Sequence, residues 1–224
     1  MNEEPQRPQA ERARFSGVVL AAGESRRMGQ LKALLPWGAL DDPRAPPLLV
    51  AQVRALREAG IDRPRVVLGH EAETLREALE EHDCLADTEI IVNGDYRLGR
   101  STSVIAGVAA CPADGGILLI HVDQPRPAWL VRQLMAAHAI RGSLITVPHY
   151  EGRQGHPPIF AARLRHELLA VEEATQGLRA IVRRHRADVQ RIPFNDAVVL
   201  ANLNTPTDYG NARRRSFRSA DTPA

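Results

Sequence analysis

Short apolar runs alternate with longer amphipathic stretches along most of the chain, and this alternation constrains the fold more than any other feature. The apolar runs are 17–22, 65–69, 89–92, 116–121 and 144–147. Stretches with helical spacing separate them at 48–59, 71–82, 101–110 and 127–140. Strands that alternate with helices in this way predict an α/β fold with a mainly parallel sheet and right-handed crossovers.

The most apolar run, Gly116–His121 (GILLIH), is expected at the centre of the sheet. Ser101 is expected to cap the helix that follows it. Beyond about residue 151 the pattern becomes irregular. It predicts helices near 163–171 and 177–185 and a late strand at 197–200. A last helix should start with Thr205 as its cap and Pro206 in the first position.

The chain of 224 residues suits one globular domain, which we place at residues 15–212. The polar segment 1–14 is expected to be disordered. Residues 213–224 are expected to form a flexible tail, in which four arginines face a single acid, Asp221. This tail accounts for much of the basic character of a chain whose formal net charge is only +2.

Composition excludes several classes of function. A net charge of +2 gives no broad basic surface for nucleic acid, and aromatics at 4% offer few rings for base stacking. No apolar run is long enough to span a membrane, and the N-terminal segment lacks the apolar core of a secretory signal. We therefore expect a cytoplasmic protein without a membrane partner. Cys84 and Cys111 are expected to be free thiols in a reducing compartment.

The loop after the first strand, LAAGESRRMGQLKALLP at 20–36, is the first candidate for chemistry. Ligands of open α/β sheets bind beyond the carboxyl ends of the strands. Gly23 would let the backbone approach a phosphate, and Arg27 and Lys32 would balance its charge. The loop fits neither the Walker pattern nor the dinucleotide glycine pattern. From the residues alone, an ordinary surface loop is an equally good interpretation.

Two later positions could hold a hard cation. Asp123 follows the most apolar strand, and a carboxylate there suits Mg²⁺, although an Asp before a turn also serves as a cap. Asn202 and Asn204 alternate about Leu203, so their amide oxygens would share one side of an extended segment. The alternative is a pair of turn residues before a helix. His121 is left out of the site, since a lone His at a strand end is usually packed or solvated.

Taken in order, these segments resemble the MobA-like nucleotidyltransferase superfamily, and most closely the molybdenum cofactor cytidylyltransferases of the MocA type. The resemblance covers about residues 16–212. It is carried by LAAGESRRMGQLKALLP (20–36), GRSTSVIAG (99–107), HVDQP (121–125), GHPPIF (155–160), GLR (177–179) and NLNTPTDY (202–209). It implies a Rossmann-like three-layer α/β/α sandwich like that of the nucleotide-diphospho-sugar transferases. A nucleotide-binding half would span about 15–125, and an acceptor-binding half about 126–212.

The resemblance also implies roles for individual residues. Nucleotide-binding residues would be Leu20, Ala21, Ala22, Gly23, Arg27, Lys32, Ser101 and Ser103. Acceptor-binding residues would be Gly155, His156, Pro157 and Arg179. Asp123 and Asn204 would hold Mg²⁺, and the catalytic residues would be Arg27, Lys32 and Asp123.

The implied reaction transfers a nucleoside monophosphate to a phosphorylated acceptor, with release of pyrophosphate. The acceptor would be molybdopterin, and a molybdoenzyme or its chaperone would be a transient partner. Ala22 stands where guanylyltransferases usually carry a second glycine, which favours CTP over GTP. Asn202 and Asn204 depart from the aspartates usual in the cytidylyltransferases, and Arg100 stands where a small residue or Met is common.

Two alternatives remain open. A guanylyl- or sugar-1-phosphate nucleotidyltransferase of the same superfamily would share the first loop and the metal-binding Asp. A protein of a different class would bind the nucleotide or cofactor and deliver it without turnover, but it would not need the charges of Arg27, Lys32 and Asp123.

Overall fold

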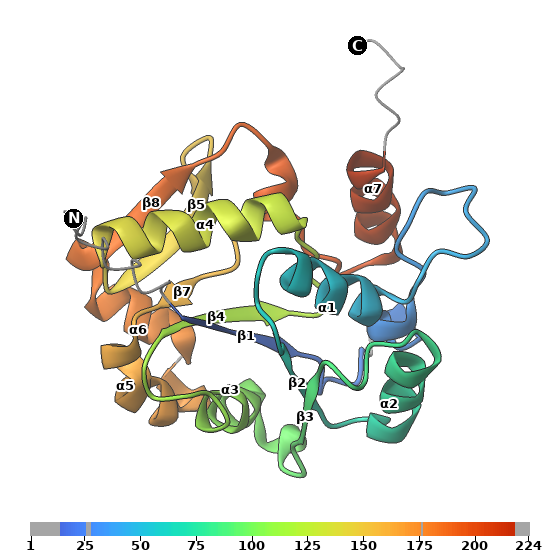
Figure 1. Cartoon of the computed structure of the whole chain (residues 1–224), viewed down its shortest axis with the longest axis horizontal. Coiled ribbons are helices and arrows are strands. Elements are labelled where there is room, and N and C mark those ends of the chain that lie inside the picture. Colours follow the sequence, from blue (N-terminus) through green and yellow to red (C-terminus); the bar gives the residue numbers. More distant parts are fainter. Residues whose placement is uncertain (1–13, 26–27, 176, 218–224) are drawn as a thin grey trace, which may run out of the picture.

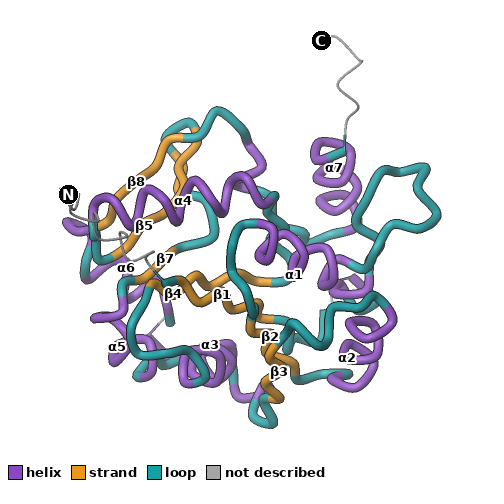
Figure 2. Tube along the Cα trace, viewed as in Figure 1, coloured by secondary structure: helices purple, strands orange, loops and turns teal. Residues whose placement is uncertain are grey.

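The computed structural model describes residues 14–25, 28–175 and 177–217. Within these residues, one eight-stranded sheet lies between two layers of helices (Figures 1 and 2). The three-layer α/β/α architecture that we expected is therefore confirmed.

The sheet is parallel in its first half and mixed in its second. The strands are β1 (Phe15–Leu20), β2 (Arg65–Leu68), β3 (Glu89–Val92), β4 (Gly116–His121), β5 (Ile145–Tyr150), β6 (Arg153–Gln154), β7 (Ile159–Phe160) and β8 (Val189–Pro193). Their order is β3-β2-β1-β4-β7-β5-β6, and β8 pairs with β5. β1 runs parallel to β2 and β4, whereas β7 is antiparallel to both β4 and β5. The strand at 116–121 is thus central, as predicted.

Each face of the sheet has its own apolar core. Helices α1 (Leu48–Glu58), α2 (Ala72–Glu81) and α4 (Ala128–Arg141) cover one face. Helices α3 (Arg100–Ala109), α5 (Arg165–Leu169) and α6 (Leu178–Arg184) cover the other. Successive residues of β1 serve the two cores in turn: Val18 and Leu20 pack beneath α3, and Val19 packs beneath α1. This is the two-residue period of a strand buried on both faces.

Gly107 allows α3 to lie close against the sheet. A Cβ atom at this position would be 2.5 Å from Cγ1 of Val18 and 2.9 Å from Cγ2 of Val67. Both valines are fully buried in neighbouring strands, so neither can move aside easily. The glycine therefore sets the separation between α3 and the sheet, and with it the position of the first turn of α3.

The last helix, α7 (Pro206–Ser216), begins as predicted. The Thr205 side chain accepts a hydrogen bond from the Asp208 N–H, and the Asp208 side chain accepts one from the Thr205 N–H. The boundary placed at residue 213 is wrong, because the helix continues to Ser216. Arg213 also donates hydrogen bonds to the carbonyls of Gly38 and Ala39, which anchors it to another loop. Residues 1–13 and 218–224, where we expected disorder and a tail, lie outside the described part of the chain.

Two local expectations are wrong. The predicted strand at Ala197–Leu200 is a 3₁₀ helix, because the Asp196 side chain accepts a hydrogen bond from the Val198 N–H and closes a turn. The late strand is instead β8. Ser101 does not cap α3 either: the helix begins one residue earlier, and the Ser101 N–H donates to a carboxylate oxygen of Glu173.

Cys84 and Cys111 are both buried free thiols, as expected. Among the described helices, none is long and apolar enough to cross a membrane.

The close contact of α3 with the sheet yields a stability prediction. Gly107→Ala should lower the free energy of unfolding by about 1–2 kcal/mol, because overpacking costs about 1–3 kcal/mol and better helix propensity returns only about 1 kcal/mol. Urea denaturation measures this change. Gly94→Ala is the control, since a Cβ there meets no atom within 4 Å. Equal stability of the two variants would contradict the packing argument.

Candidate active site

A cavity of about 900 Å³ lies at the carboxyl ends of β1 and β4. The last residues of these strands, Leu20 and His121, are register partners, and both line the cavity. This is the edge at which open α/β sheets bind their ligands. The cavity thus lies where the sequence placed the candidate site.

Most of the predicted site residues that the structure describes meet in this one cavity. It is lined by Leu20, Ala22, Gly23, Lys32, Ser101, Ser103, Asp123, His156, Arg179 and Asn204. Ala21, Gly155 and Pro157 are not among the lining residues. Arg27 lies outside the described residues.

Ala21 and Gly155 serve the fold rather than the cavity wall. The Ala21 N–H donates to the carbonyl of Val67, and its side chain belongs to the core on the face opposite Leu20. A Cβ at Gly155 would lie 2.4 Å from the Val199 carbonyl oxygen. The glycine therefore lets the loop that carries His156 pack against the segment before Asn202.

Gly23 behaves differently from Gly155. A Cβ at Gly23 would meet no atom of the described residues within 4 Å, although the residue lies on the cavity wall. Packing of the described chain does not require a glycine here. The open space in front of this backbone suits a ligand that approaches it closely.

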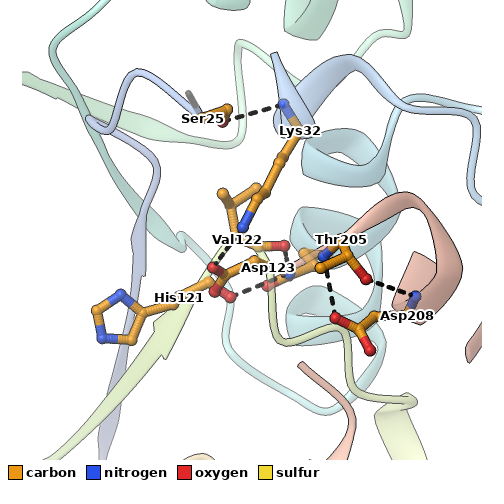
Figure 3. Close-up of polar contacts among 8 residues, drawn as sticks. Ser25, Lys32, His121, Val122, Asp123, Thr205 and Asp208 are labelled. Carbon is orange, nitrogen blue, oxygen red and sulfur yellow. Dashed lines mark hydrogen bonds and ion pairs between the residues drawn. The ribbon is translucent and has the colours of Figure 1, made fainter. Parts of the chain in front are cut away.

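Lys32 and Asp123 form the charged centre of the cavity (Figure 3). The Lys32 Nζ atom lies 3.1 Å from a carboxylate oxygen of Asp123. Lys32 is only 7% exposed and is the one lysine of the entire sequence. Its backbone N–H donates to the Ser25 hydroxyl, which ties the start of a 3₁₀ helix, Lys32–Leu34, to the first loop. The Lys32 ammonium is buried and needs a partner such as the Asp123 carboxylate, because its loss of hydration would otherwise be costly.

A backbone hydrogen bond joins the two segments that were predicted to hold a cation. The Leu203 N–H donates to the Asp123 carbonyl at 2.8 Å, and Leu203 itself is fully buried. Asn202 and Asn204, on either side of it, line the same cavity as Asp123. The adjacent capping box at Thr205 and Asp208 fixes where this segment turns into α7.

These oxygen donors fit a hard cation that arrives with its ligand. Within the described residues, no group of three or more His, Cys, Asp or Glu side chains could hold a metal. One carboxylate with neighbouring amide oxygens instead matches the way Mg²⁺ binds, through one or two carboxylates plus substrate phosphates and water.

Arg126, which the sequence reasoning did not single out, fastens the loops around this centre. Its guanidinium donates to the carbonyls of Pro125 at 2.7 Å, His156 at 2.8 Å, Val199 at 2.9 Å and Ala201 at 3.0 Å. Arg126 is 4% exposed, and burial lowers its pKa to about 9, against the opposing effect of Asp123. It therefore stays charged near neutral pH and ties the loops after β4, before β7 and before Asn202 together.

Two histidines on the cavity wall are held neutral. Burial, aided by the charge of Arg126, lowers the pKa of His156 to about 4. Burial also lowers the pKa of His121, a shift that Asp123 opposes and Arg100 reinforces. His121 does line the cavity, although we left it out of the site. At neutral pH both rings can form hydrogen bonds without adding positive charge.

Asn93, directly after β3, is a second residue that the sequence reasoning missed. Its side-chain nitrogen donates to the hydroxyls of Ser103 at 3.0 Å and Thr102 at 2.9 Å. The Ser103 hydroxyl, which lines the cavity, is thereby oriented. A polar residue at the carboxyl end of a predicted strand was the available signal.

Comparison with known proteins agrees with this geometry. A family model described as the MobA-like NTP transferase domain matches residues 17–189. The chain belongs to the MobA-like NTP transferase family. It is a nucleotidyltransferase, related to molybdenum cofactor cytidylyl- and guanylyltransferases, as expected.

The named relatives differ in their reactions. Molybdenum cofactor cytidylyltransferase of Escherichia coli (strain K12) is 26% identical over 88% of this chain and 95% of its own length. A probable molybdenum cofactor guanylyltransferase of Opitutus terrae is 29% identical over 90% of this chain and 96% of its own. A protein of Paenarthrobacter nicotinovorans named nicotine blue oxidoreductase is 31% identical over 85% of this chain and 92% of its own length.

Among solved structures, Rv0371c of Mycobacterium tuberculosis H37Rv has a TM-score of 0.76 and 27% identity, over 91% of this chain and 99% of that one. Its complex with manganese has a TM-score of 0.72 and 26% identity, over 90% of this chain and 98% of that one. A structural neighbour has therefore been solved in complex with manganese.

The contacts of Arg126 yield a test of its structural role. Arg126→Met should lower the free energy of unfolding by about 3 kcal/mol, because it leaves several buried carbonyls without a donor, each costing about 1–3 kcal/mol before relaxation. It should also raise amide hydrogen exchange in the segment 201–204. Arg126→Lys retains the charge but not the planar fork, so it should recover only part of the loss. Unchanged exchange and stability in the Met variant would contradict the role.

Proposed function

We propose that the protein transfers CMP from CTP to the phosphate of molybdopterin and releases pyrophosphate. The observation that carries this proposal is the meeting of Lys32 and Asp123 in one cavity at the strand ends. The Lys32 ammonium suits a polyphosphate. The Asp123 carboxylate suits a metal ion that accompanies that polyphosphate. The resemblance of the motifs to cytidylyltransferases supports the choice of acceptor.

The nucleotide is proposed to lie along Leu20, Ala22 and Gly23, with its phosphates toward Lys32. The open space in front of Gly23 admits a ligand close to the backbone. The buried hydroxyls of Ser101 and Ser103 offer hydrogen bonds to the base. Ala22, where a second glycine is usual in guanylyltransferases, favours CTP over GTP.

The chemical step forms a bond between an acceptor phosphate oxygen and the α-phosphorus, and breaks the bond to the leaving pyrophosphate. The acceptor phosphate is already anionic near neutral pH, so no strong general base is needed. Lys32 would stabilise the leaving pyrophosphate by charge, and Arg27 is proposed to assist it. Neutral His156, beside the acceptor, would form a hydrogen bond without adding charge.

Asp123 and Asn204 are the residues that would hold Mg²⁺. Bound there, the cation would supply charge neutralisation at the phosphate oxygens. Amide oxygens in place of carboxylates lower the negative charge of the site, so occupancy should depend on the nucleotide phosphates.

The reaction is tested by pyrophosphate release from CTP, GTP, UTP and ATP, each with and without molybdopterin. We expect release with CTP, dependent on both molybdopterin and Mg²⁺. Faster release with GTP would overturn the base preference, and release with a sugar 1-phosphate alone would overturn the acceptor. Binding of CTP without turnover would favour the alternative of a protein that binds and delivers the nucleotide or cofactor. The same assay distinguishes nucleotidyl transfer, which releases pyrophosphate, from the oxidation or reduction named for the relative called nicotine blue oxidoreductase.

Lys32→Ala tests the charged centre. We expect kcat to fall by about 100- to 1000-fold, as when one donor to a developing charge is removed, while the folded structure is retained. Arg141→Ala is the control, since Arg141 is exposed at the end of α4 and outside the cavity. A Lys32→Ala protein that turns over at the rate of the control would refute the assignment.

A further inference from the structure

Four of the five described arginines that line the cavity come from one stretch of the chain, residues 179–191, and the chemistry at Lys32 and Asp123 leaves most of them without a role. Arg179 and Arg183 are one turn apart on α6, Arg186 begins a 3₁₀ helix (Arg186–Asp188) directly after it, and Arg191 lies on β8. All four line the cavity. We call this set the arginine wall.

The arginine wall has no acidic partner among the described residues. Each acid on the cavity lining is engaged elsewhere: Asp123 with Lys32, Glu173 with the Ser101 N–H, and Glu24 with Arg97 at 3.6 Å. Arg184 provides the contrast within the same helix. It lies off the cavity lining and pairs with Glu167.

Uncompensated positive charge in a concave site attracts anions. Clefts lined by charge of one sign focus the field and raise the local concentration of counter-ions. The guanidinium group also matches phosphate and similar oxyanions through paired hydrogen bonds. The wall therefore suits a compact group with more than one negative charge.

The position of the wall separates it from the phosphate that reacts. Arg179 and Arg183 lie on α6, and Arg191 lies on β8, which β7 and β5 separate from β4 in the sheet. Lys32 and Asp123, in contrast, lie on the segments that follow β1 and β4. The volume of about 900 Å³ is near the top of the range of about 300–1,000 Å³ for ligand pockets.

We propose that the arginine wall is a second anion-binding subsite, which holds an anionic group of the acceptor other than the phosphate that reacts. The proposal rests on the proposed transfer reaction and narrows its substrate. The acceptor must carry at least two separate anionic groups. A sugar 1-phosphate, whose only charge is on the reacting phosphate, would leave the wall unused.

The first experiment measures anion binding without any acceptor. The nucleotide site is saturated with Mg²⁺ and the α,β-methylene analogue of the nucleotide that the wild type binds best, and inorganic phosphate is titrated by calorimetry. Arg183→Gln/Arg186→Gln is compared with the charge-matched control Arg141→Gln/Arg153→Gln, whose arginines are exposed and off the cavity lining. We expect phosphate to bind the wild type and control, and to bind the wall variant about tenfold more weakly.

Absence of phosphate binding to the saturated wild type, or equal binding to all three proteins, would overturn the subsite. The single variants Arg183→Gln and Arg186→Gln keep the test open if the double variant does not fold. Added salt should weaken phosphate binding more in the wild type than in the wall variant, because the variant has lost two of the charges that salt would screen.

The second experiment uses turnover with molybdopterin. The wall variant should raise the KM for molybdopterin about tenfold and leave the KM for CTP and kcat unchanged. An unchanged KM for molybdopterin would overturn the assignment to the acceptor. If no protein releases pyrophosphate, the proposed function fails, and the phosphate titration still decides whether the wall binds anions.

Discussion

The buried guanidinium of Arg126 determines how the loops of the site are arranged relative to one another. A charge removed from water is costly unless it is well hydrogen-bonded, and here four carbonyls from three loops accept hydrogen bonds from it. Any movement of one loop would leave a buried charge underbonded. The residues that those loops carry, Asp123, His156 and Asn204, are therefore positioned as a set. The Leu203–Asp123 hydrogen bond adds a second connection between two of them.

Local sequence patterns predicted the parts of the fold that depend on local interactions. The apolar runs marked the central strands, and Thr205 with Pro206 marked the start of α7, since a cap and its helix are adjacent in the chain. β8 was missed because its burial comes from pairing with β5, whose sequence is about 45 residues away, and VQRIP carries only a weak apolar pattern. The residues at 197–200 are apolar enough for a strand, yet one Asp side chain before them closes a turn.

In the candidate site too, residues that depend on local sequence could be predicted, and residues that depend on distant contacts could not. Asp123 could be predicted, because it follows the most apolar strand, and a parallel sheet gathers ligands at that edge. Arg126 could not, because its acceptors at His156 and Ala201 are 30 and 75 residues away. The family motifs pointed to loops that line the cavity, but they did not separate the residues that line it from the residues that support it. Gly155 illustrates this, since its lack of a side chain serves a backbone contact with Val199.

Lys32 has a consequence for chemical labelling that follows from its being the chain's one lysine. Every other basic side chain that is always charged is a guanidinium, which ordinary amine reagents do not acylate. A reagent that modifies lysine must therefore enter the cavity to reach the only side-chain amine in the molecule. The rate of that modification would measure how often the cavity is open to solvent, and any ligand that fills it would protect a single, readily mapped position.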